Sequence, residues 1–259
     1  DNKMTDNGPD PFSLVGQVAL ITGGGTGLGL GIAKAFVTQG AQVIISGRRK
    51  EVLQKAKEEL GSNTDYRVHD VTDYSASEPL VKSIEKQYGR ITCLVNNAGN
   101  QIKKPAEELT EDEMVEVLNT HLIGAFSLTR VVANTMLDKG GGSILFTASM
   151  ASLFGIPYVA SYSAAKTAHL GLVRTLTAEW ASRRVRVNAI APGWIMTDLS
   201  RRSLDTDPKR VERILERTPM KCFGEAEDIG WTAAFLASPA AKFITGACLP
   251  VDGGASIGF

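Results

Sequence analysis

Residues 17–29 read Gln-Val-Ala-Leu-Ile-Thr-Gly-Gly-Gly-Thr-Gly-Leu-Gly, a short apolar run followed at once by a glycine-rich turn. The run has the length and composition of a buried β-strand, and the glycines open the helix that we expect next. Because glycine has no Cβ, Gly23, Gly27 and Gly29 let the backbone turn tightly and direct amide groups and the positive end of a helix toward a pyrophosphate. The stretch therefore predicts a strand–turn–helix unit that binds a dinucleotide.

Beyond this stretch, short runs rich in Val and Ile alternate with longer amphipathic segments. That alternation is typical of βαβ units around a parallel sheet buried on both faces, which predicts an α/β fold with a doubly wound, seven-stranded sheet. Ligands in such a fold bind beyond the carboxyl ends of the strands. We expect strands at 17–22, 42–46, 66–69, 91–96, 143–147, 184–190 and 247–251, and helices at 27–39, 49–60, 75–88, 110–138, 162–182 and 226–237.

The chain divides into a short tail and one domain. Residues 1–11 are polar, and Asp1-Asn-Lys before Met4 resembles an expression remnant, so we expect a disordered tail and a domain spanning 12–259. The segment 194–224 is polar, contains Pro208 and Pro219, and is the one long insertion, which we interpret as an irregular lid over a substrate.

Composition excludes several classes of protein. The 259 residues carry 28 basic and 28 acidic side chains, so zero net charge gives no electrostatic reason to expect nucleic acid or an anionic membrane as a partner. No run approaches the roughly 20 apolar residues that cross a bilayer, and the N-terminus lacks a basic region before an apolar stretch. We expect a protein that is neither secreted nor membrane-spanning and that acts on a small molecule.

The cysteines and histidines show no metal-ligand spacing, so we predict no metal site. Three cysteines are too few for a disulfide framework, which makes a reducing cytoplasm the expected compartment. We interpret each histidine as a core or solvated residue. These six residues are Cys93, Cys222, Cys248, His69, His121 and His169.

Tyr162-Ser-Ala-Ala-Lys166 carries the clearest chemical signal. A tyrosine and a lysine four residues apart on a helix share one face, so the ammonium of Lys166 is expected to lower the pKa of the Tyr162 phenol toward neutrality. Such a phenol is a usable general acid and base. Ser149, just past an expected strand, can hold a reacting oxygen.

Four motifs occur in order along nearly the whole chain, and together they resemble the short-chain dehydrogenase/reductase family. The first is the spacing Thr22-Gly-x-x-x-Gly-x-Gly29, and Asn96-Asn-Ala-Gly99 and Pro192-Gly193 follow other expected strands. The Tyr162/Lys166 pair is the fourth motif. The resemblance implies a Rossmann fold and a nicotinamide-dependent enzyme that moves hydride between its cofactor and a carbonyl or secondary alcohol.

The resemblance also implies roles for single residues. Tyr162 would be the acid/base, Lys166 would hold the nicotinamide ribose, and Ser149 would hold the carbonyl oxygen. Asn119 matches the fourth position of the family's catalytic set, whose backbone holds a water. The expected cofactor site comprises Gly23, Gly25, Thr26, Gly27, Leu28, Gly29, Arg48, Asp70, Val71, Asn96, Ala98, Gly99, Tyr162, Lys166, Pro192, Gly193, Ile195 and Thr197.

The choice of cofactor depends on the end of the second strand, where Gly47 and Arg48 stand. Glycine cannot repel a 2′-phosphate and a guanidinium can bind one, so we predict NADP(H), with NAD(H) possible. The alternative is that Arg48 belongs to a solvated basic turn. For Asp70, contact with the adenine ring and an ordinary turn aspartate are both open.

Several substrates remain open. The loop after Gly99 carries Lys103 and Lys104, as in gluconate 5-dehydrogenases, so our first expectation is a sugar acid or polyol; a solvated lysine pair is the alternative. A 3-oxoacyl-carrier-protein reductase comes second, disfavoured by Gly140-Gly-Gly142 where a basic surface would be expected. A ketone beside the apolar stretch 153–158 and a non-catalytic NADP(H) sensor are further alternatives. The expected substrate contacts are Gln101, Lys103, Ser149, Ala151, Tyr162 and Trp194.

Assembly follows from the same resemblance, because family members are commonly homotetramers. The expected helix 110–138 carries enough apolar residues for more than one contact face, and the apolar tail 255–259 could join the packing. The alternative is that these residues pack only within the subunit. The helix residues are Val115, Leu118, Leu122, Phe126 and Val131.

Overall fold

A seven-stranded parallel sheet forms the centre of the protein in a computed structural model, which describes residues 10–197, 200–201 and 207–258. The strand order is β3-β2-β1-β4-β5-β6-β9, which confirms the predicted doubly wound fold. The strands are β1 (Val18–Thr22), β2 (Gln42–Gly47), β3 (Thr64–Val68), β4 (Cys93–Asn96), β5 (Gly142–Thr147), β6 (Val185–Pro192) and β9 (Cys248–Val251).

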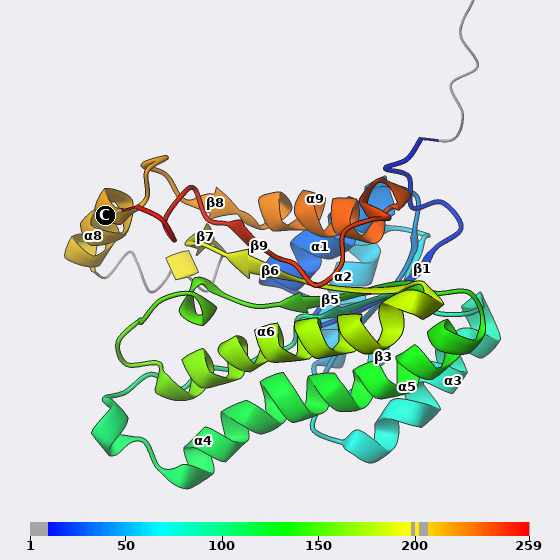
Figure 1. Ribbon diagram of the computed structural model, residues 1–259, viewed down its shortest axis with the longest axis horizontal. Coiled ribbons are helices and arrows are strands. Elements are labelled where there is room, and N and C mark those ends of the chain that lie inside the picture. The colour runs from blue at the N-terminus through cyan, green and yellow to red at the C-terminus, as the bar shows by residue number, and fades with distance from the viewer. Residues whose placement is uncertain (1–9, 198–199, 202–206, 259) are drawn as a thin grey trace, which may run out of the picture.

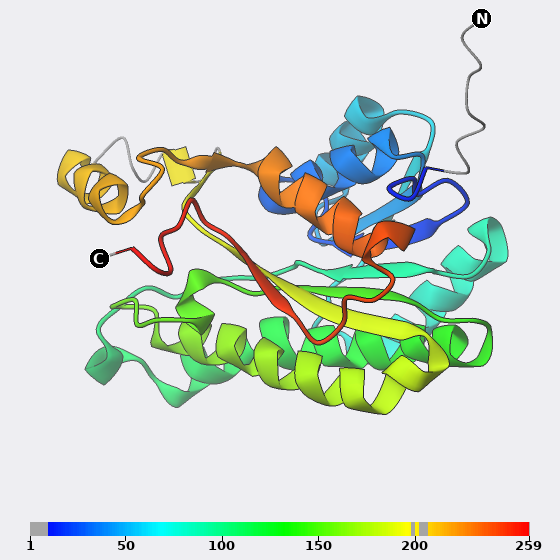
Figure 2. The same cartoon turned by 45° about the horizontal axis from the view of Figure 1, so that its top comes forward.

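Helices cover both faces of this sheet (Figures 1 and 2). The helices α1, α2 and α9 form one layer, and α3, α4, α5 and α6 form the other, while α8 lies off one end of the sheet. Their bounds are α1 (Gly27–Thr38), α2 (Lys50–Leu60), α3 (Ser77–Tyr88), α4 (Glu111–Leu118), α5 (Ala125–Asp138), α6 (Ala160–Trp180), α8 (Pro208–Arg217) and α9 (Ala226–Ala237).

The continuous apolar runs of the central strands follow from this sandwich. Leu20 of β1 packs into the core beneath α3, α5 and α6, whereas its neighbour Ile21 packs into the core shared with α1 and α9. Both side chains are fully buried, as are Ile44 and Ile45 on β2. Each such burial stabilises the fold by about 1.5–3 kcal/mol, so both faces of a strand must be apolar.

The order of the strands also places a crevice. The chain leaves β1 for β2 on one side, and after β3 it returns to pair β4 with the other side of β1. The loops after β1 and β4 therefore part in opposite directions at the carboxyl end of the sheet. This switch point is where open α/β sheets bind ligands.

The expected helix 110–138 is interrupted. It consists of α4, a wide π-helical turn η3 (Asn119–Gly124) and α5. A Cβ on Gly124 would lie 2.5 Å from the Val71 carbonyl oxygen, so only glycine allows this close approach to the loop after β3. Wide turns of this kind are frequent at functional sites.

The segment 194–224 is more regular than its composition indicates. Asp207 caps α8 by accepting a hydrogen bond from the Arg210 amide at 3.0 Å, and Pro208 occupies the first turn, where a missing amide is harmless. The short strands β7 (Ile195–Met196) and β8 (Gly224–Glu225) pair in parallel and bracket the segment. Residues 198–199 and 202–206 lie outside the described part of the chain.

The chain is already held in place just before the predicted start of the domain. The Pro11 carbonyl accepts a hydrogen bond from the Ala240 amide at 2.8 Å, and the Phe12 ring lies 6.1 Å from that of Phe235. Residues 1–9 of the predicted tail fall outside the described residues. Among the described helices, none is both long and apolar enough to cross a membrane.

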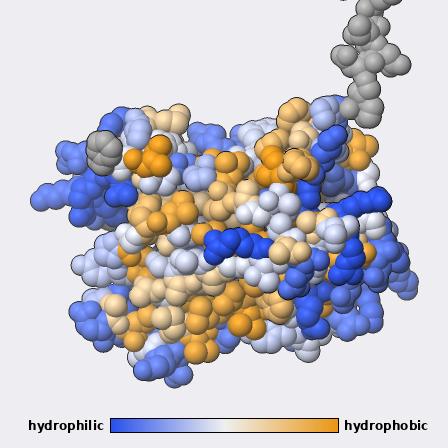
Figure 3. Space-filling view, in the orientation of Figure 1, coloured by the Kyte–Doolittle hydropathy of each residue, from blue (hydrophilic) through white to orange (hydrophobic). Residues whose placement is uncertain are grey.

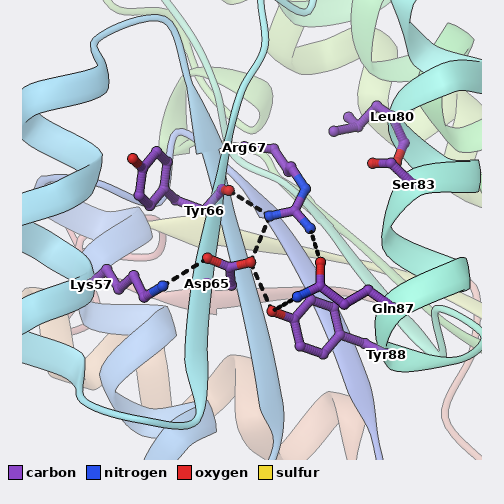
Figure 4. A network of polar contacts seen from close by, with 8 residues as sticks. All are labelled: Lys57, Asp65, Tyr66, Arg67, Leu80, Ser83, Gln87 and Tyr88. Atoms are coloured by element: carbon purple, nitrogen blue, oxygen red, sulfur yellow. Dashed lines mark hydrogen bonds and ion pairs between the residues drawn. The ribbon is translucent and has the colours of Figure 1, made fainter.

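A charged network fastens the edge strand β3 to helices of both layers (Figure 4). The Asp65 carboxylate accepts hydrogen bonds from Lys57 of α2 at 2.9 Å and from Tyr88 of α3 at 2.7 Å. Arg67 donates to the same carboxylate at 2.6 Å and to Gln87 at 2.7 Å. Burial raises the pKa of Asp65, but the hydrogen bonds from Arg67, Tyr88 and Lys57 outweigh it and hold this pKa well below its usual range.

We predict that Asp65→Asn lowers the free energy of unfolding by about 1–3 kcal/mol at pH 7, because the amide cannot accept all three charged or polar donors. The folded-state pKa of Asp65 is depressed, so its contribution is fully present above the unfolded-state pKa near 4 and is lost progressively as pH falls from there toward the lower folded-state pKa. Urea unfolding from pH 7 to pH 3 should show a difference from wild type that is constant above about pH 5 and shrinks progressively below about pH 4.

The control is Glu78→Gln, which removes an exposed pair with Lys82 on one helix. Its effect should stay within about 0.5 kcal/mol. A loss as small for Asp65→Asn would contradict the assignment of the network as a fastening between the layers.

Candidate active site

The turn between β1 and α1 is built from glycines that no other residue could replace. Gly23 and Gly27 have φ values of +64° and +53°, which side chains disfavour. A Cβ on Gly29 would overlap the Gly23 carbonyl oxygen, and one on Gly24 would lie 2.6 Å from the Ile45 side chain. The helix therefore starts as close to the strand as the backbone permits.

The amino end of α1 has the chemistry of an anion site. Thr26 is the N-cap residue, yet its side chain makes no capping hydrogen bond. The first amides of a helix have no partners within the helix, and they carry its positive dipole end. Backbone amides at an uncapped, glycine-lined turn match a pyrophosphate, so the residues present fit the dinucleotide that the sequence predicts.

The loop after β4 is tied directly to this turn. The Thr22 hydroxyl oxygen accepts hydrogen bonds from the Asn97 and Ala98 amides, each at 3.0 Å. Asn97 in turn donates its side-chain amide to the Thr22 carbonyl at 3.0 Å. The neighbouring Asn96 side chain points toward α5, where it donates a hydrogen bond to the Thr129 hydroxyl at 2.8 Å. Asn97, absent from the predicted site, is thus the residue that fixes the distance between the two loops.

The ends of β2 and β3 place Arg48 and Asp70 near one another. Asp70 accepts hydrogen bonds from the Thr72 amide at 2.9 Å and the Thr72 hydroxyl at 2.8 Å, the geometry of a turn aspartate. The bond from the Thr72 backbone does most to lower the pKa of Asp70, and the positive charge of Arg48 lowers it further. Val71 is buried beside Gly124, so it shapes the loop from within.

The loop after β6 closes over the same turn. The Gly193 amide donates to the Val251 carbonyl at 2.9 Å, and a Cβ on Gly193 would lie 2.5 Å from Asp252. The Thr197 side chain lies 3.8 Å from where a Cβ on Gly27 would be. The loop after β6 therefore lies next to the glycine turn at Thr197, and the cofactor contacts of Pro192 and Ile195 stay predictions.

Tyr162 and Lys166 lie on one face of α6, as predicted. The Lys166 ammonium is 5.5 Å from the centroid of the Tyr162 ring. Ser149 follows β5 and reaches the Tyr162 phenol, while its oxygen also accepts a hydrogen bond from the Ala151 amide at 3.1 Å. Burial raises the pKa of Tyr162, and hydrogen bonding to Ser149 lowers it by less. The phenol is therefore protonated at neutral pH and can donate a proton.

The predicted effect of Lys166 on the pKa of the phenol stays a prediction. The Lys166 ammonium is buried and donates to the Thr147 carbonyl at the end of β5. Burial lowers the pKa of Lys166 to about 7.

Comparison with known proteins places the chain among enzymes. A family model described as Enoyl-(Acyl carrier protein) reductase matches residues 23–256. A 2-dehydro-3-deoxy-D-gluconate 5-dehydrogenase of Bacillus subtilis is 40% identical over 250 residues, 95% of this chain and 96% of the relative. A 3-oxoacyl-[acyl-carrier-protein] reductase of Thermotoga maritima is 35% identical over 244 residues, 93% of this chain and 98% of the relative.

Solved structures agree with these relatives. A gluconate 5-dehydrogenase from Burkholderia cenocepacia, crystallised in complex with NADP and tartrate, has a TM-score of 0.91 at 33% identity, covering 96% of this chain and 99% of that one. The chain belongs to the short-chain dehydrogenase/reductase family. It is accordingly an oxidoreductase that acts on CH–OH and C=O groups with a nicotinamide cofactor, as the motifs predicted.

The fourth position of the short-chain dehydrogenase/reductase catalytic set lies in the wide turn η3, and the predicted role of the Asn119 backbone stays a prediction. His121 of the same turn lies against Tyr162, with ring centroids 5.4 Å apart and planes at 88°. The Asn119 carbonyl faces Gly124, 3.1 Å from where its Cβ would be. The wide turn η3 rotates the helix face between these residues, which regular helical spacing does not anticipate. Gly124 inside a long helix was the available signal.

The expected substrate residues of this family member differ in their exposure and in their contacts. Gln101 and Lys103 are exposed on the loop after β4. Lys104, the second lysine there, pairs with Glu113 at 2.6 Å and is therefore occupied. The Arg210 guanidinium carbon lies 5.9 Å from a ring centroid of Trp194. The Trp194 indole nitrogen is buried, and the described part of the chain offers it no hydrogen-bond partner.

The three histidines of this short-chain dehydrogenase/reductase are all buried, with exposures of 1–5%. Burial lowers the pKa of His69, His121 and His169. Within residues 10–197, 200–201 and 207–258, no group of three or more His, Cys, Asp or Glu side chains could hold a metal ion.

Proposed function

We propose that the protein is an NADP(H)-dependent oxidoreductase of a sugar acid or polyol, similar to gluconate 5-dehydrogenases. The observation that carries the proposal is that Ser149, Tyr162 and Lys166 meet at the carboxyl end of β5, beside the loop after β4 that Asn97 bonds to the glycine turn. Lys103 on the rim and the names of the relatives support the substrate class.

In this proposal the chain's own side chains manage the reacting oxygen. The bound nicotinamide supplies or accepts the hydride. Ser149 donates a hydrogen bond to the substrate carbonyl, and Tyr162 donates its phenol proton to that oxygen as negative charge develops there. In the oxidative direction the tyrosine takes the proton back. Lys166, anchored at the Thr147 carbonyl, stabilises the transient phenolate because it can hold a positive charge.

The cofactor would be held by three groups of residues. Amides around Gly23, Gly27 and Thr26 would bind the pyrophosphate, and the loop of Thr197 would hold the nicotinamide end. We propose that Arg48 binds the 2′-phosphate of NADP, because Gly47 beside it offers no carboxylate to repel that group.

A sugar acid fits the charge at the rim. No partner for Lys103 is found among the described residues, and its side chain is exposed beside the loop that follows Gly99. A carboxylate on the substrate would pair with this ammonium while a hydroxyl or ketone reaches Tyr162 and Ser149. Tartrate, bound to the Burkholderia cenocepacia relative, is itself a hydroxy acid.

A second candidate is reduction of a 3-oxoacyl chain on acyl carrier protein, favoured by the Thermotoga maritima relative. Such an enzyme docks an acidic carrier through basic side chains. Gly140 and Gly141 occupy the turn before β5 and Gly142 begins that strand, so these three residues offer no charge there. The candidate therefore ranks below the sugar acid.

We also propose a homotetramer. Large apolar side chains of Val115, Ile123 and Phe126 remain 50%, 43% and 38% exposed along α4, η3 and α5. Figure 3 shows apolar residues gathered over this helical face of the subunit. Exposed apolar surface of this kind marks contacts between chains. A cytoplasmic location is proposed on the free cysteines, of which Cys93 is buried in the core.

The proposed function is tested by absorbance at the reduced-nicotinamide band, with NADP and NAD in parallel, against gluconate, 5-ketogluconate, neutral polyols and an acetoacetyl thioester. We expect NADP-linked turnover of a sugar acid. Lys103→Ala should raise the KM for the acid about fivefold, since a rim ion pair contributes up to about 1 kcal/mol, and leave the KM for a neutral polyol unchanged.

Lys139→Ala, which removes an exposed lysine after α5, is the matched control and should change neither constant. Turnover of the thioester alone would assign the protein to the second candidate. Absence of turnover across the panel would contradict the proposed function.

Arg48→Ala should reduce the ratio of NADP to NAD efficiency by about 10- to 100-fold, because a charge-assisted contact to phosphate contributes about 1.5–3 kcal/mol. The measurement is kcat/KM for each cofactor at saturating substrate. Arg49→Ala, which removes the neighbouring cation, is the control, and its ratio of NADP to NAD efficiency should stay near that of the wild type. An equal drop in both variants would favour the solvated basic turn instead.

A further inference from the structure

A buried pair of histidines stands next to the proposed proton donor. His121 in η3 is 2% exposed and His169 in α6 is 1% exposed, and their ring centroids lie 6.5 Å apart. The edge of the His121 ring meets the Tyr162 ring at 5.4 Å. Neither histidine takes part in the proposed mechanism. A role for them rests on the proposed function of Tyr162 as the proton donor.

The His121 side chain is anchored to the loop after β4. Its Nε2 lies 2.7 Å from the Asn100 carbonyl oxygen and 3.1 Å from the Asn100 amide nitrogen. The shorter contact is a hydrogen bond from Nε2–H to the carbonyl, because the other tautomer would leave a buried Nδ1–H without an acceptor. The ring also fills the space in which a Cβ on Gly99 would stand.

The His121 backbone is anchored to the helix that carries Tyr162. His169 Nε2 donates to the His121 carbonyl at 2.9 Å. His169 is one helical turn beyond Lys166, and its ring packs against Phe146 of β5 at 5.2 Å. These two hydrogen bonds fix η3 to the Asn100 loop and to α6, and the ring contact of His121 connects η3 to Tyr162.

The pair adds no charge beside Lys166. Burial, reinforced by the positive charge of Lys166, lowers the pKa of His121 and of His169 to about 3. The charged or titratable groups that face these rings are Lys166 and Tyr162. Neutral imidazoles therefore offer directional hydrogen bonds without competing with the ammonium.

We propose that His121 is a positioning residue for Tyr162: its Nε2–H bond to the Asn100 carbonyl holds the ring against which the tyrosine is seated, and His169 fixes its backbone. Leucine at position 121 would fill similar space but could not donate to Asn100. Glutamine places an amide nitrogen near the position of Nε2 and keeps the donor. The pair of substitutions separates the hydrogen bond from the packing.

The experiment measures kcat and KM for His121→Leu and His121→Gln on whichever carbonyl substrate the wild type reduces fastest. If sugar acids are not substrates, the proposed function is overturned, while the role of His121 is still tested on the substrate that the enzyme does reduce. We expect His121→Leu to lose at least tenfold in kcat, with KM for NADPH within threefold of wild type. His121→Gln should recover kcat to within threefold of wild type.

Met136→Ala is the control for a general loss of packing, because Met136 is fully buried at the far end of α5. It should lower Tm without reducing kcat by more than twofold. His169→Leu, which removes the bond to the His121 carbonyl and keeps an apolar side chain beside Phe146, should reduce kcat at least fivefold and supplies the test if His121→Leu does not fold. A kcat within twofold of wild type in the folded leucine variants, or no recovery with glutamine, would overturn the proposal.

Discussion

The backbone contact between Gly29 and the Gly23 carbonyl is the constraint on which the rest of the site depends. Because no Cβ fits there, α1 starts directly over the end of β1 and presents uncapped amides to the crevice. Thr22 and Asn97 then fasten the loop after β4 to the same turn. The sheet behind these loops is buried on both faces, so the crevice has a rigid floor.

The catalytic side of the crevice is arranged by backbone carbonyls as much as by side chains. The Thr147 carbonyl receives Lys166, the His121 carbonyl receives His169, and the Asn100 carbonyl receives His121. These bonds join α6 to the end of β5, α6 to η3, and η3 to the loop after β4. Tyr162 is thus placed by elements from separate parts of the chain, whose relative positions the sheet fixes.

The sequence predicted the sheet well, because strands buried on both faces must be apolar without interruption, as at Leu20 and Ile21. Tyr162 and Lys166 could be found because four-residue spacing on a helix is regular, and Ser149 because it follows an expected strand and matches the family resemblance. The prediction of an irregular segment around Pro208 missed α8, because a proline that begins a helix cannot be told in a sequence from one that prevents a helix.

What the sequence could not predict depends on irregular geometry and burial. The wide turn η3 brings His121 to Tyr162, and the one sign of it in the sequence is Gly124 inside a long helix. The direction in which the pKa of Tyr162 shifts depends first on burial, which exists only once α6 has packed. In the sequence Lys103 and Lys104 are equivalent, and only the ion pair between Lys104 and Glu113 in the folded chain distinguishes them.

Whether Tyr162 donates the proton at the reacting oxygen is decided by comparing wild type with Tyr162→Phe, measuring NADPH binding by fluorescence and turnover by absorbance. We expect the variant to bind NADPH within about threefold of wild type and to lose at least about 100-fold in kcat, because general acid catalysis contributes roughly 10²–10⁴-fold. Turnover within about tenfold of wild type would contradict the role of Tyr162 as proton donor.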